Sequence, residues 1–538
     1  MGKMDLDNFV TGQTLQDLLI TIKCPFNKIK LNGIYSDIEI KIILSCHMIN
    51  TTLIEILKTF SKDEMKKFED MVRSSYFNKD KPVIKLFEQI KKFHPEFKNI
   101  DIKRETIFGK MFPDKVFNYG TMKNLIYGLQ KLCEKFIMYH EINKDTFEMK
   151  RSLINGFRNR ELINLAEKNL KDLENNFLGN ELTDNTHFKK MYLIDQLKNK
   201  QIFQSTKGNI HIKESMRAAY YEQLLHSIKN QKKYFIFDTL RSYNLIITNK
   251  NIINSKSPIE ECDKFLKSFD EDEFEDITIK SEISFLKMNL GRITEEEFLE
   301  LKKIVLKDLY EMNAGKDIIY AYSIFLLNYC RIKRRTDTMY LKYALEISKS
   351  LVLNKNFDDE GGYMNLILSR NIILIATELL EFKWCEDFLK LNLNRIHPDH
   401  RDSITFFYNA FKSFRLGDFN DSLVYVSKLN NEDIFNKSYI KELVIINYFE
   451  LKYYDLLTEQ LDSYKKFLVN NETFPDSYKV PSKNFINFVY KLYKAVSDKK
   501  TDLHYLKEEV NKEKDLLFKE WILKKIEEIL PARKNVKC

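Results

Sequence analysis

The chain has 538 residues, 44% of them hydrophobic and 13% aromatic, so it can bury one large core or a series of stacked cores. Its 14 Gly and 9 Pro lie well below the usual fractions of about 7% and 5%, which favours helix along most of the chain. The net charge of +9 is small beside 87 basic and 78 acidic residues and singles out no partner.

The cysteines indicate a reducing compartment. They are odd in number, and no two have metal-ligand spacing, which is typical of free thiols in a cytosol: Cys24, Cys46, Cys133, Cys262, Cys330, Cys385 and Cys538. No stretch approaches the roughly 18 apolar residues of a membrane span, and residues 1–47 lack the features of a signal peptide. We therefore predict a cytoplasmic protein without a membrane partner.

Residues 1–47 differ from the rest of the chain. They hold scattered Gly and Pro and no sustained helical stripe, whereas an amphipathic segment follows Met48 at once. We expect translation to begin at Met48, so that residues 1–47 are upstream sequence. The alternative is a short disordered or loosely attached arm.

Residues 48–143 predict a compact helical module. Ser61 and Glu64 form a capping box, which opens one helix, and Pro82 starts the next. A short helix over Glu105–Met111 is followed by a long one over about Tyr119–Tyr139.

Several short runs in this module and further along the chain carry a family resemblance: Phe60-Ser61-Lys62, Ser75-Tyr76-Phe77-Asn78, Met111-Phe112-Pro113, Asn328-Tyr329-Cys330, Phe382-Lys383-Trp384 and Trp521-Ile522-Leu523. Through them, residues 48–530 resemble an uncharacterised bacterial family that occurs mainly in Bacteroidota and their relatives. Members of that family start near the position of Met48. The resemblance implies an all-helical architecture and no particular activity.

Residues 144–300 predict helical hairpins of irregular length. The expected helices are Phe147–Phe157, Glu161–Phe177, Thr186–Phe203, Ile212–Ile228 and Tyr234–Ile247, with another beginning at Pro258. The acidic run 270–276 lies in a connection. It could take a basic partner or a divalent cation, but a solvated loop is the favoured interpretation.

Residues 301–470 contain helix pairs that repeat. Around Gly417 the apolar residues follow a helical stripe, the Gly occupies a helix C-terminus, and a second helix opens at Phe419. Two positions of the second helix recur at spacings of 41, 37 and 35 residues: Leu341/Ala344, Phe382/Cys385, Phe419/Ser422 and Tyr454/Leu457. These spacings are close to the roughly 34 residues of a tetratricopeptide repeat. We predict an all-α fold, a right-handed α-α superhelix of such repeats preceded by the N-terminal module.

The last part of the chain predicts a loop and two helices. Residues 471–484 contain Pro475 and Pro481 and are expected to form the loop. Helices are expected at Phe485–Val496 and Leu503–Leu530, the second as a cap on the repeats, and residues 531–538 as a polar tail.

The sequence contains no strong catalytic, cofactor-binding or metal-binding motif. The sequence has no phosphate loop, dinucleotide fingerprint or zinc-protease motif, so we predict no catalytic residue, cofactor or metal site. The run His397-Pro398-Asp399-His400 is the most metal-like cluster, and a polar turn between repeats is the favoured interpretation. The run 358–362 is interpreted as a turn, and Cys330 as a core residue.

Nucleic-acid binding by the N-terminal module is the rival interpretation. Residues 48–143 contain 18 Lys and Arg against 13 Asp and Glu, a net charge of +5. The short helix, turn and long helix loosely resemble a helix-turn-helix, with Lys123, Lys131 and Lys135 as candidate contacts on the long helix. The β-hairpin of a winged helix is missing, and three lysines are also typical of a helix face in water.

Superhelices of helix pairs expose a long concave surface without a reactive pocket, which suits a peptide or protein ligand. We therefore predict a non-catalytic scaffold that binds a protein or peptide in its concave groove. The alternative is a nucleic-acid-binding regulator in which the repeats act as a sensor or dimerisation part.

Overall fold

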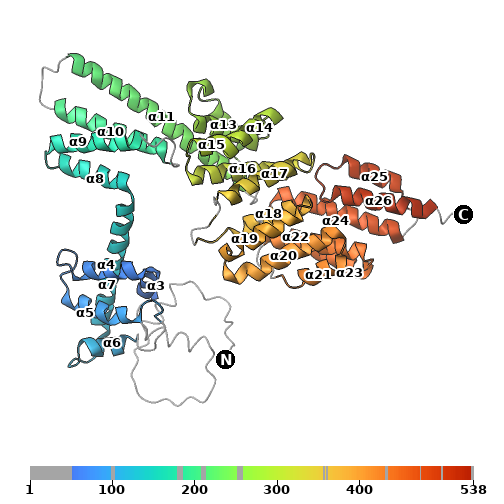
Figure 1. Ribbon diagram of the computed structural model, residues 1–538, viewed down its shortest axis with the longest axis horizontal. Helices are drawn as coiled ribbons and strands as arrows, with labels where there is room; N and C mark the ends of the chain where they lie inside the picture. The colour runs from blue at the N-terminus through green and yellow to red at the C-terminus, as the bar shows by residue number, and fades with distance from the viewer. Residues whose placement is uncertain are drawn as a thin grey trace, which may run out of the picture. The chain divides into compact units, whose positions relative to one another are not determined.

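The computed structural model describes residues 51–97, 103–178, 186–206, 214–250, 258–354, 358, 362–429, 434–472, 474–497 and 501–534. These residues form helices and one isolated β-bridge, between Asp358 and Met364, which confirms the all-α prediction. The expected upstream segment 1–47 and the expected start at Met48 lie outside the described residues. The chain divides between Leu153 and Ile154 into an N-terminal and a C-terminal unit, each with its own colours in Figure 1.

The N-terminal unit is built around one long helix. Its helices are α3 (Thr51–Thr59), α4 (Lys62–Arg73), α5 (Lys81–Ile90), α6 (Arg104–Met111), α7 (Tyr119–Lys144) and the start of α8 (Thr146–Arg158). The predicted capping box at Ser61 and Glu64 is confirmed, with both reciprocal hydrogen bonds present. α3, α4 and α5 all pack on α7, where Phe68, Phe87 and Phe136 are buried together. The local signals of this module therefore predicted its helices well.

The C-terminal unit is a succession of helices that fold back on one another (Figure 1). Their bounds are α9 (Ile163–Leu178), α10 (His187–Thr206), α11 (Glu214–Lys250), α12 (Ile259–Leu266), α13 (Ile277–Asn289), α14 (Glu295–Lys303), α15 (Leu309–Glu311), α16 (Lys316–Lys333), α17 (Met339–Leu353), α18 (Leu366–Glu378), α19 (Phe382–Asn392), α20 (Arg401–Leu416), α21 (Phe419–Val426), α22 (Ile434–Glu450), α23 (Tyr454–Asn470), α24 (Asp476–Ser497), α25 (Leu503–Lys512) and α26 (Lys519–Lys534). One continuous hydrophobic core runs from α17 to α26.

The pair α20–α21 has the geometry that the sequence predicted. Gly417 ends α20 with φ +86°, a left-handed conformation that suits a residue without Cβ. Phe407 and Phe411 are buried on the predicted stripe. On α21, the fully buried Ser422 donates a hydrogen bond to the Ala410 carbonyl at 2.9 Å, so the small side chain lets the two helices approach closely.

The break predicted between residues 228 and 234 does not exist, because α11 is one continuous helix. The polar residues there do not form a turn. Asn230 is buried and donates a hydrogen bond to Asp195 of α10 at 2.6 Å. A polar residue in this stretch therefore satisfies a buried carboxylate across the hairpin, and the stretch has no Gly or Pro to end the helix.

The loop predicted for residues 471–484 is also wrong beyond its first residues, because α24 begins at Asp476 and contains Pro481. A proline inside a helix leaves the carbonyl four residues earlier without its usual donor. That carbonyl belongs to Ser477, and the guanidinium of Arg335 donates to it at 2.6 Å. A long-range contact thus replaces the hydrogen bond that Pro481 cannot make.

The predicted closing helix Leu503–Leu530 is two helices, α25 and α26. The chain turns at Phe518, which has φ +53°. The Lys519 ammonium donates to the carbonyls of Asn511 and Glu513, both at 2.9 Å, and so satisfies the end of α25. The break is stabilised by these contacts and has no Gly or Pro signal in the sequence.

Candidate functional site

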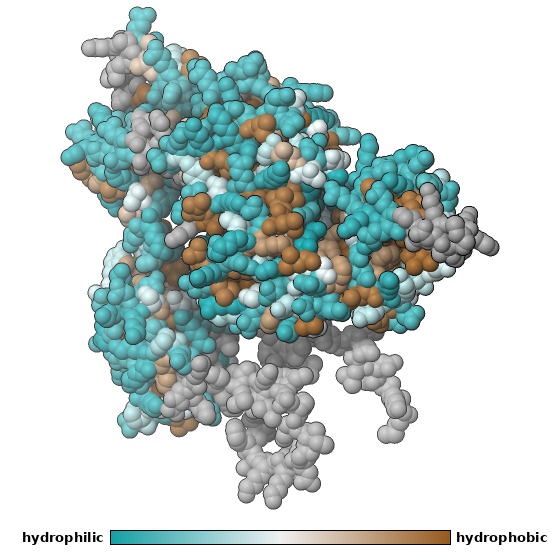
Figure 2. Space-filling view, turned by 45° about the vertical axis from the view of Figure 1, so that its right-hand side comes forward, coloured by the Kyte–Doolittle hydropathy of each residue, from teal (hydrophilic) through white to brown (hydrophobic). Residues whose placement is uncertain are grey.

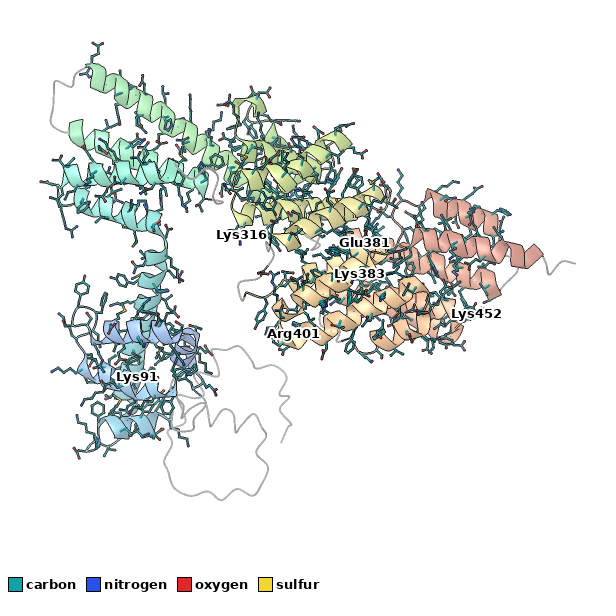
Figure 3. All side chains as sticks on the ribbon, in the orientation of Figure 1. Lys91, Lys316, Glu381, Lys383, Arg401 and Lys452 are labelled. Atoms are coloured by element: carbon teal, nitrogen blue, oxygen red, sulfur yellow. The ribbon has the colours of Figure 1, made fainter. Side chains whose placement is uncertain are left out.

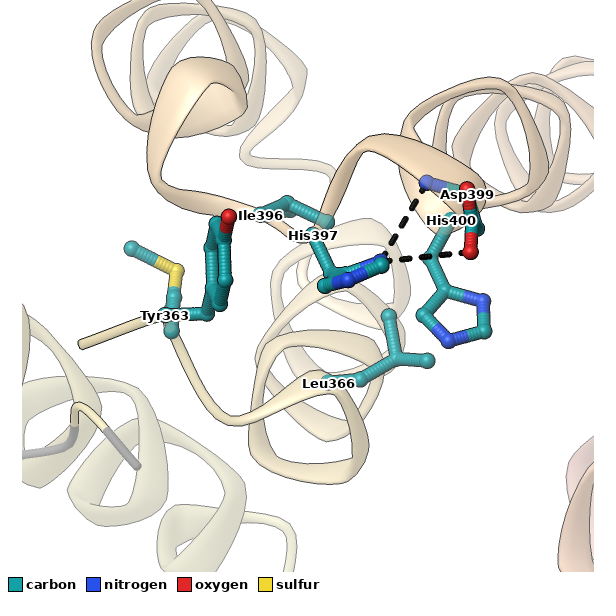
Figure 4. Close-up of a pocket in the computed structure, with 7 residues that line it drawn as sticks. Tyr363, Leu366, Ile396, His397, Asp399 and His400 are labelled. Carbon is teal, nitrogen blue, oxygen red and sulfur yellow. Dashed lines mark hydrogen bonds and ion pairs between the residues drawn. The ribbon is translucent and has the colours of Figure 1, made fainter. Parts of the chain in front are cut away.

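The His397–His400 run forms a turn, as favoured by the sequence. Pro398–His400 is a short 3-10 turn before α20, and Nδ1 of His397 lies 3.6 Å from the Asp399 carboxylate and accepts from the Asp399 amide at 3.4 Å (Figure 4). A cavity of about 300 Å³ adjoins it, lined also by Tyr363 and Leu366. Among the residues that the structure describes, no three His, Cys, Asp or Glu side chains are grouped so as to hold a metal ion.

Three of the six acidic residues in the run 270–276 form ion pairs with lysines of the same unit. Glu271 pairs with Lys287 at 2.6 Å, and Asp276 pairs with Lys233 at 2.9 Å. Glu273 forms an ion pair with Lys232. These contacts join the acidic connection to α11 and α13, which gives the run a structural role.

Two other residues from the sequence analysis have clear positions. Asp358 forms an ion pair with Arg395, while residues 359–361 of the same run lie outside the described residues. Cys330 is buried as predicted, and burial raises the pKa of its thiol to about 12. A thiol with such a pKa stays protonated and unreactive near neutral pH.

The three candidate nucleic-acid contacts Lys123, Lys131 and Lys135 are exposed on α7. Lys131 forms an ion pair with Glu134 at 2.6 Å and lies over the ring of Tyr127. These positions are compatible with a helix face in water and with a contact surface, so the candidate contacts stay a prediction.

The strongest candidate site is a pocket of about 320 Å³ in the C-terminal unit, lined by residues of α16, α17 and α18 together with Tyr439 of α22 and Tyr478 of α24. We call it the α16–α18 pocket. Its volume is at the lower end of the range for small-ligand pockets, about 300 to 1,000 Å³. A pocket of this size can hold one or two amino-acid side chains. On the face of the molecule shown in Figure 2, apolar side chains gather in patches between hydrophilic ones.

One part of the α16–α18 pocket is apolar. Its lining there includes Ile324 and Leu327 of α16, Leu341 of α17, and Leu368 and Leu374 of α18. These side chains also pack against, or belong to, the hydrophobic cores of the unit. Ile367 lies on the pocket lining with 57% of its surface exposed. An apolar group entering the pocket would therefore be removed from water on several sides.

The other part of the pocket is cationic. The lining residues include Arg331 and Arg334, near the C-terminal end of α16, and no Asp or Glu. The Arg331 guanidinium lies 4.3 Å from the centre of the Tyr478 ring. Arg334 donates to the Glu378 carboxylate at 2.8 Å, and this carboxylate raises the pKa of Arg334. Both arginines remain charged at any physiological pH.

Further cations lie close to this part of the pocket. The guanidinium of Arg415 is 4.0 Å from the same Glu378 carboxylate. Arg335 follows Arg334 directly and pairs with Asp515 at 3.1 Å. Burial lowers the pKa of both Arg335 and Arg415, because a buried guanidinium group is poorly solvated.

Three side-chain amides line the pocket, and one of them, Asn365, accepts a hydrogen bond from the Leu368 amide at 2.9 Å and caps α18. Asn328 of α16 and Asn371 of α18 both line it, and within the described part of the chain neither side chain makes a hydrogen bond to another residue. A carboxamide offers two donors and one acceptor, which is the complement of a peptide backbone. By contrast, the hydroxyl of Ser348 donates to the Ala344 carbonyl of its own helix at 2.7 Å.

None of these pocket residues was predicted as a site. The available signal was the run Arg331-Ile332-Lys333-Arg334-Arg335 at the end of an apolar helix, which concentrates four cations in five residues. The sequence could not show that Tyr439 and Tyr478, more than a hundred residues later, lie against the same run.

No family model, curated protein or solved structure matches this chain. None of the helices that the structure describes is both long enough and apolar enough to cross a membrane.

Proposed function

We propose that the protein is a non-catalytic scaffold whose C-terminal unit binds a segment of a partner protein in the α16–α18 pocket. In this proposal the helix pairs of residues 301–470 are tetratricopeptide-like repeats of a right-handed superhelix, and the pocket is part of its concave groove. The cytoplasm is the proposed compartment, since Cys133, Cys262, Cys330 and Cys385 are free and buried.

The observation that carries the proposal is the combination of apolar walls with the amides of Asn328 and Asn371 in one pocket. Apolar walls favour a buried side chain of the ligand, and amides without partners favour a hydrogen-bonding backbone beside it. A peptide supplies both groups.

Site-specific photo-crosslinking tests this proposal in the full chain. A benzophenone amino acid replaces Ile367, which lines the pocket and is 57% exposed, in cells where the chain occurs naturally. The matched control places the same group at Leu391 of α19, which is 75% exposed and does not line the pocket. Both positions tolerate a large side chain because they face solvent.

The expected result is a discrete protein adduct at position 367 that is absent at position 391. Identical adducts at both positions, or none at position 367, would contradict binding in the pocket. Crosslinks to nucleic acid at position 367 would instead assign the pocket to the alternative regulator.

A further inference from the structure

We infer that the α16–α18 pocket selects a peptide that carries a carboxylate close to a large apolar side chain, with Arg331 and Arg334 binding the carboxylate. The inference rests on the proposed function, because it specifies the ligand of the same pocket. Two sources share this chemistry, the free C-terminus of the peptide and an Asp or Glu side chain, and the test below distinguishes them.

The charge balance of the pocket favours an anion. Two guanidinium groups line it and no Asp or Glu does. Glu378, which does not line the pocket, pairs with Arg334 at 2.8 Å and lies 4.0 Å from Arg415. The Glu378 carboxylate thus lies within 4.0 Å of two partly buried guanidinium groups, those of Arg334 and Arg415. A ligand carboxylate would therefore meet two guanidinium groups and no like charge among the residues that line the pocket.

The stacking of Arg331 favours a planar, two-oxygen ligand group. Its guanidinium lies 4.3 Å from the centre of the Tyr478 ring, and Tyr478 also lines the pocket. Stacking on a ring fixes the plane of a guanidinium group, and its N–H groups lie in that plane. Arginine edges of this kind bind carboxylates with two parallel hydrogen bonds, which lysine cannot do.

The spacing along α16 sets the separation between charge and apolar group. Ile324 and Leu327 line the apolar part and Arg331 lines the cationic part of the same helix. From Ile324 to Arg331 the helix rises roughly 10 Å. An extended peptide covers that length in about three residues. The apolar side chain and the carboxylate of the ligand should therefore lie within about three residues of each other.

Asn328 stands between these two parts, one helical turn before Arg331, and faces the same pocket as Asn371. The backbone linking the apolar side chain to the carboxylate would pass these two amides. This order of groups (apolar wall, amides, guanidinium groups) matches the order of groups in such a peptide.

Selection from random peptides tests the inference without assuming a sequence. The full chain is used to select from two libraries of short peptides, one displayed with free C-termini and one with the random segment internal. The expected result is enrichment of an Asp or Glu near a large apolar residue, or of a large apolar residue near a free C-terminus. The library that yields binders identifies the source of the carboxylate.

The affinities of the selected peptides are then measured by fluorescence anisotropy. Replacing the carboxylate by an amide should weaken binding roughly tenfold or more, as expected for a lost charge-assisted pair. Arg331→Gln should cause a similar loss, and Arg331→Lys an intermediate one, because the charge remains without the planar fork. The control Lys383→Gln, on α19 (Figure 3), makes the same charge change at a side chain that is 84% exposed.

Peptides that bind equally well without a carboxylate, a Lys383→Gln effect as large as that of Arg331→Gln, or the absence of any enriched peptide would overturn the inference. The proposed function would survive these results if the crosslink at position 367 still identified a protein partner. An unfolded Arg331→Gln variant, recognised by its tryptophan fluorescence, leaves the amide comparison and Arg331→Lys as the deciding measurements.

Discussion

Glu442 of α22 offers a quantitative test of the C-terminal core. Its side chain is only 4% exposed, and Oε1 accepts hydrogen bonds from the hydroxyls of Tyr464, Ser438 (3.3 Å) and Ser482 (3.1 Å). It forms no ion pair among the described residues. Burial raises the pKa of Glu442 to about 7, although these hydroxyls act in the opposite direction.

The raised pKa has a defined effect on stability. The pKa moves from its ordinary value of 4.5 to about 7, so the native state binds the proton more tightly than the unfolded state. The free energy of unfolding from this group is therefore greatest below about pH 4.5 and is lost as the pH rises through 7. The change in pKa from 4.5 to about 7 corresponds to about 3 kcal/mol of unfolding free energy.

Glu442→Gln removes this dependence, because the amide is neutral at every pH and its oxygen can accept the same hydroxyls. We expect the variant to match the wild type to within about 1 kcal/mol near pH 5 and to exceed it by about 3 kcal/mol near pH 8.

Denaturant unfolding of the full chain, followed by tryptophan fluorescence, measures this difference. Both tryptophans of the chain, Trp384 and Trp521, lie on helices of the C-terminal unit, so the signal reports the unit that contains Glu442. A difference that stays constant between these pH values, or a variant less stable than the wild type near pH 8, would refute a protonated buried Glu442.

Three further substitutions test the packing of the same unit by the same unfolding assay. Gly417→Ala should lower the free energy of unfolding by about 1 to 2 kcal/mol. The loss comes from the φ of +86° alone, because no atom lies within 4 Å of the added Cβ. An unchanged free energy of unfolding would contradict the left-handed turn. Phe407→Ala should cost about 3 to 5 kcal/mol, since this ring is 1% exposed. Glu450→Ala should lower the free energy of unfolding by about 3 kcal/mol, because it removes the acceptor of Trp521 Nε1 (2.6 Å) and a partner of Lys525 (2.7 Å). An unchanged emission of Trp521 would argue against the contact between Glu450 and Trp521.

Local signals predicted the helices that depend on local interactions. The capping box at Ser61, the left-handed Gly417 and the stripe through Phe407 each involve residues within a few positions of one another. Hydrophobic periodicity and capping motifs predict such features directly from the sequence.

The errors arose where distant residues decide the local structure. α24 contains Pro481 because Arg335, far away in the chain, donates to the carbonyl of Ser477. α11 continues through its polar stretch because Asn230 donates a hydrogen bond to Asp195 on α10. A local pattern contains neither partner, so Pro481 and the polar stretch were assigned to a loop and a break.

The α16–α18 pocket was out of reach for the same reason. Its residues come from five helices, and only the basic run ending at Arg335 was visible as a cluster. The run could equally have been a solvated helix end. The run lines a pocket only because the fold places Tyr439 and Tyr478 beside it.

Quantitative affinity capture from the native host, with and without nuclease, tests most directly whether the α16–α18 pocket binds a protein. The bait proteins are the full-length wild type, Ile367→Asp in the pocket lining and Leu391→Asp as an equally charged surface control. We predict a protein that is retained by the wild type and by Leu391→Asp, depleted by Ile367→Asp and unaffected by nuclease. Partners that vanish with nuclease, or that both variants retain equally, would contradict binding in the pocket.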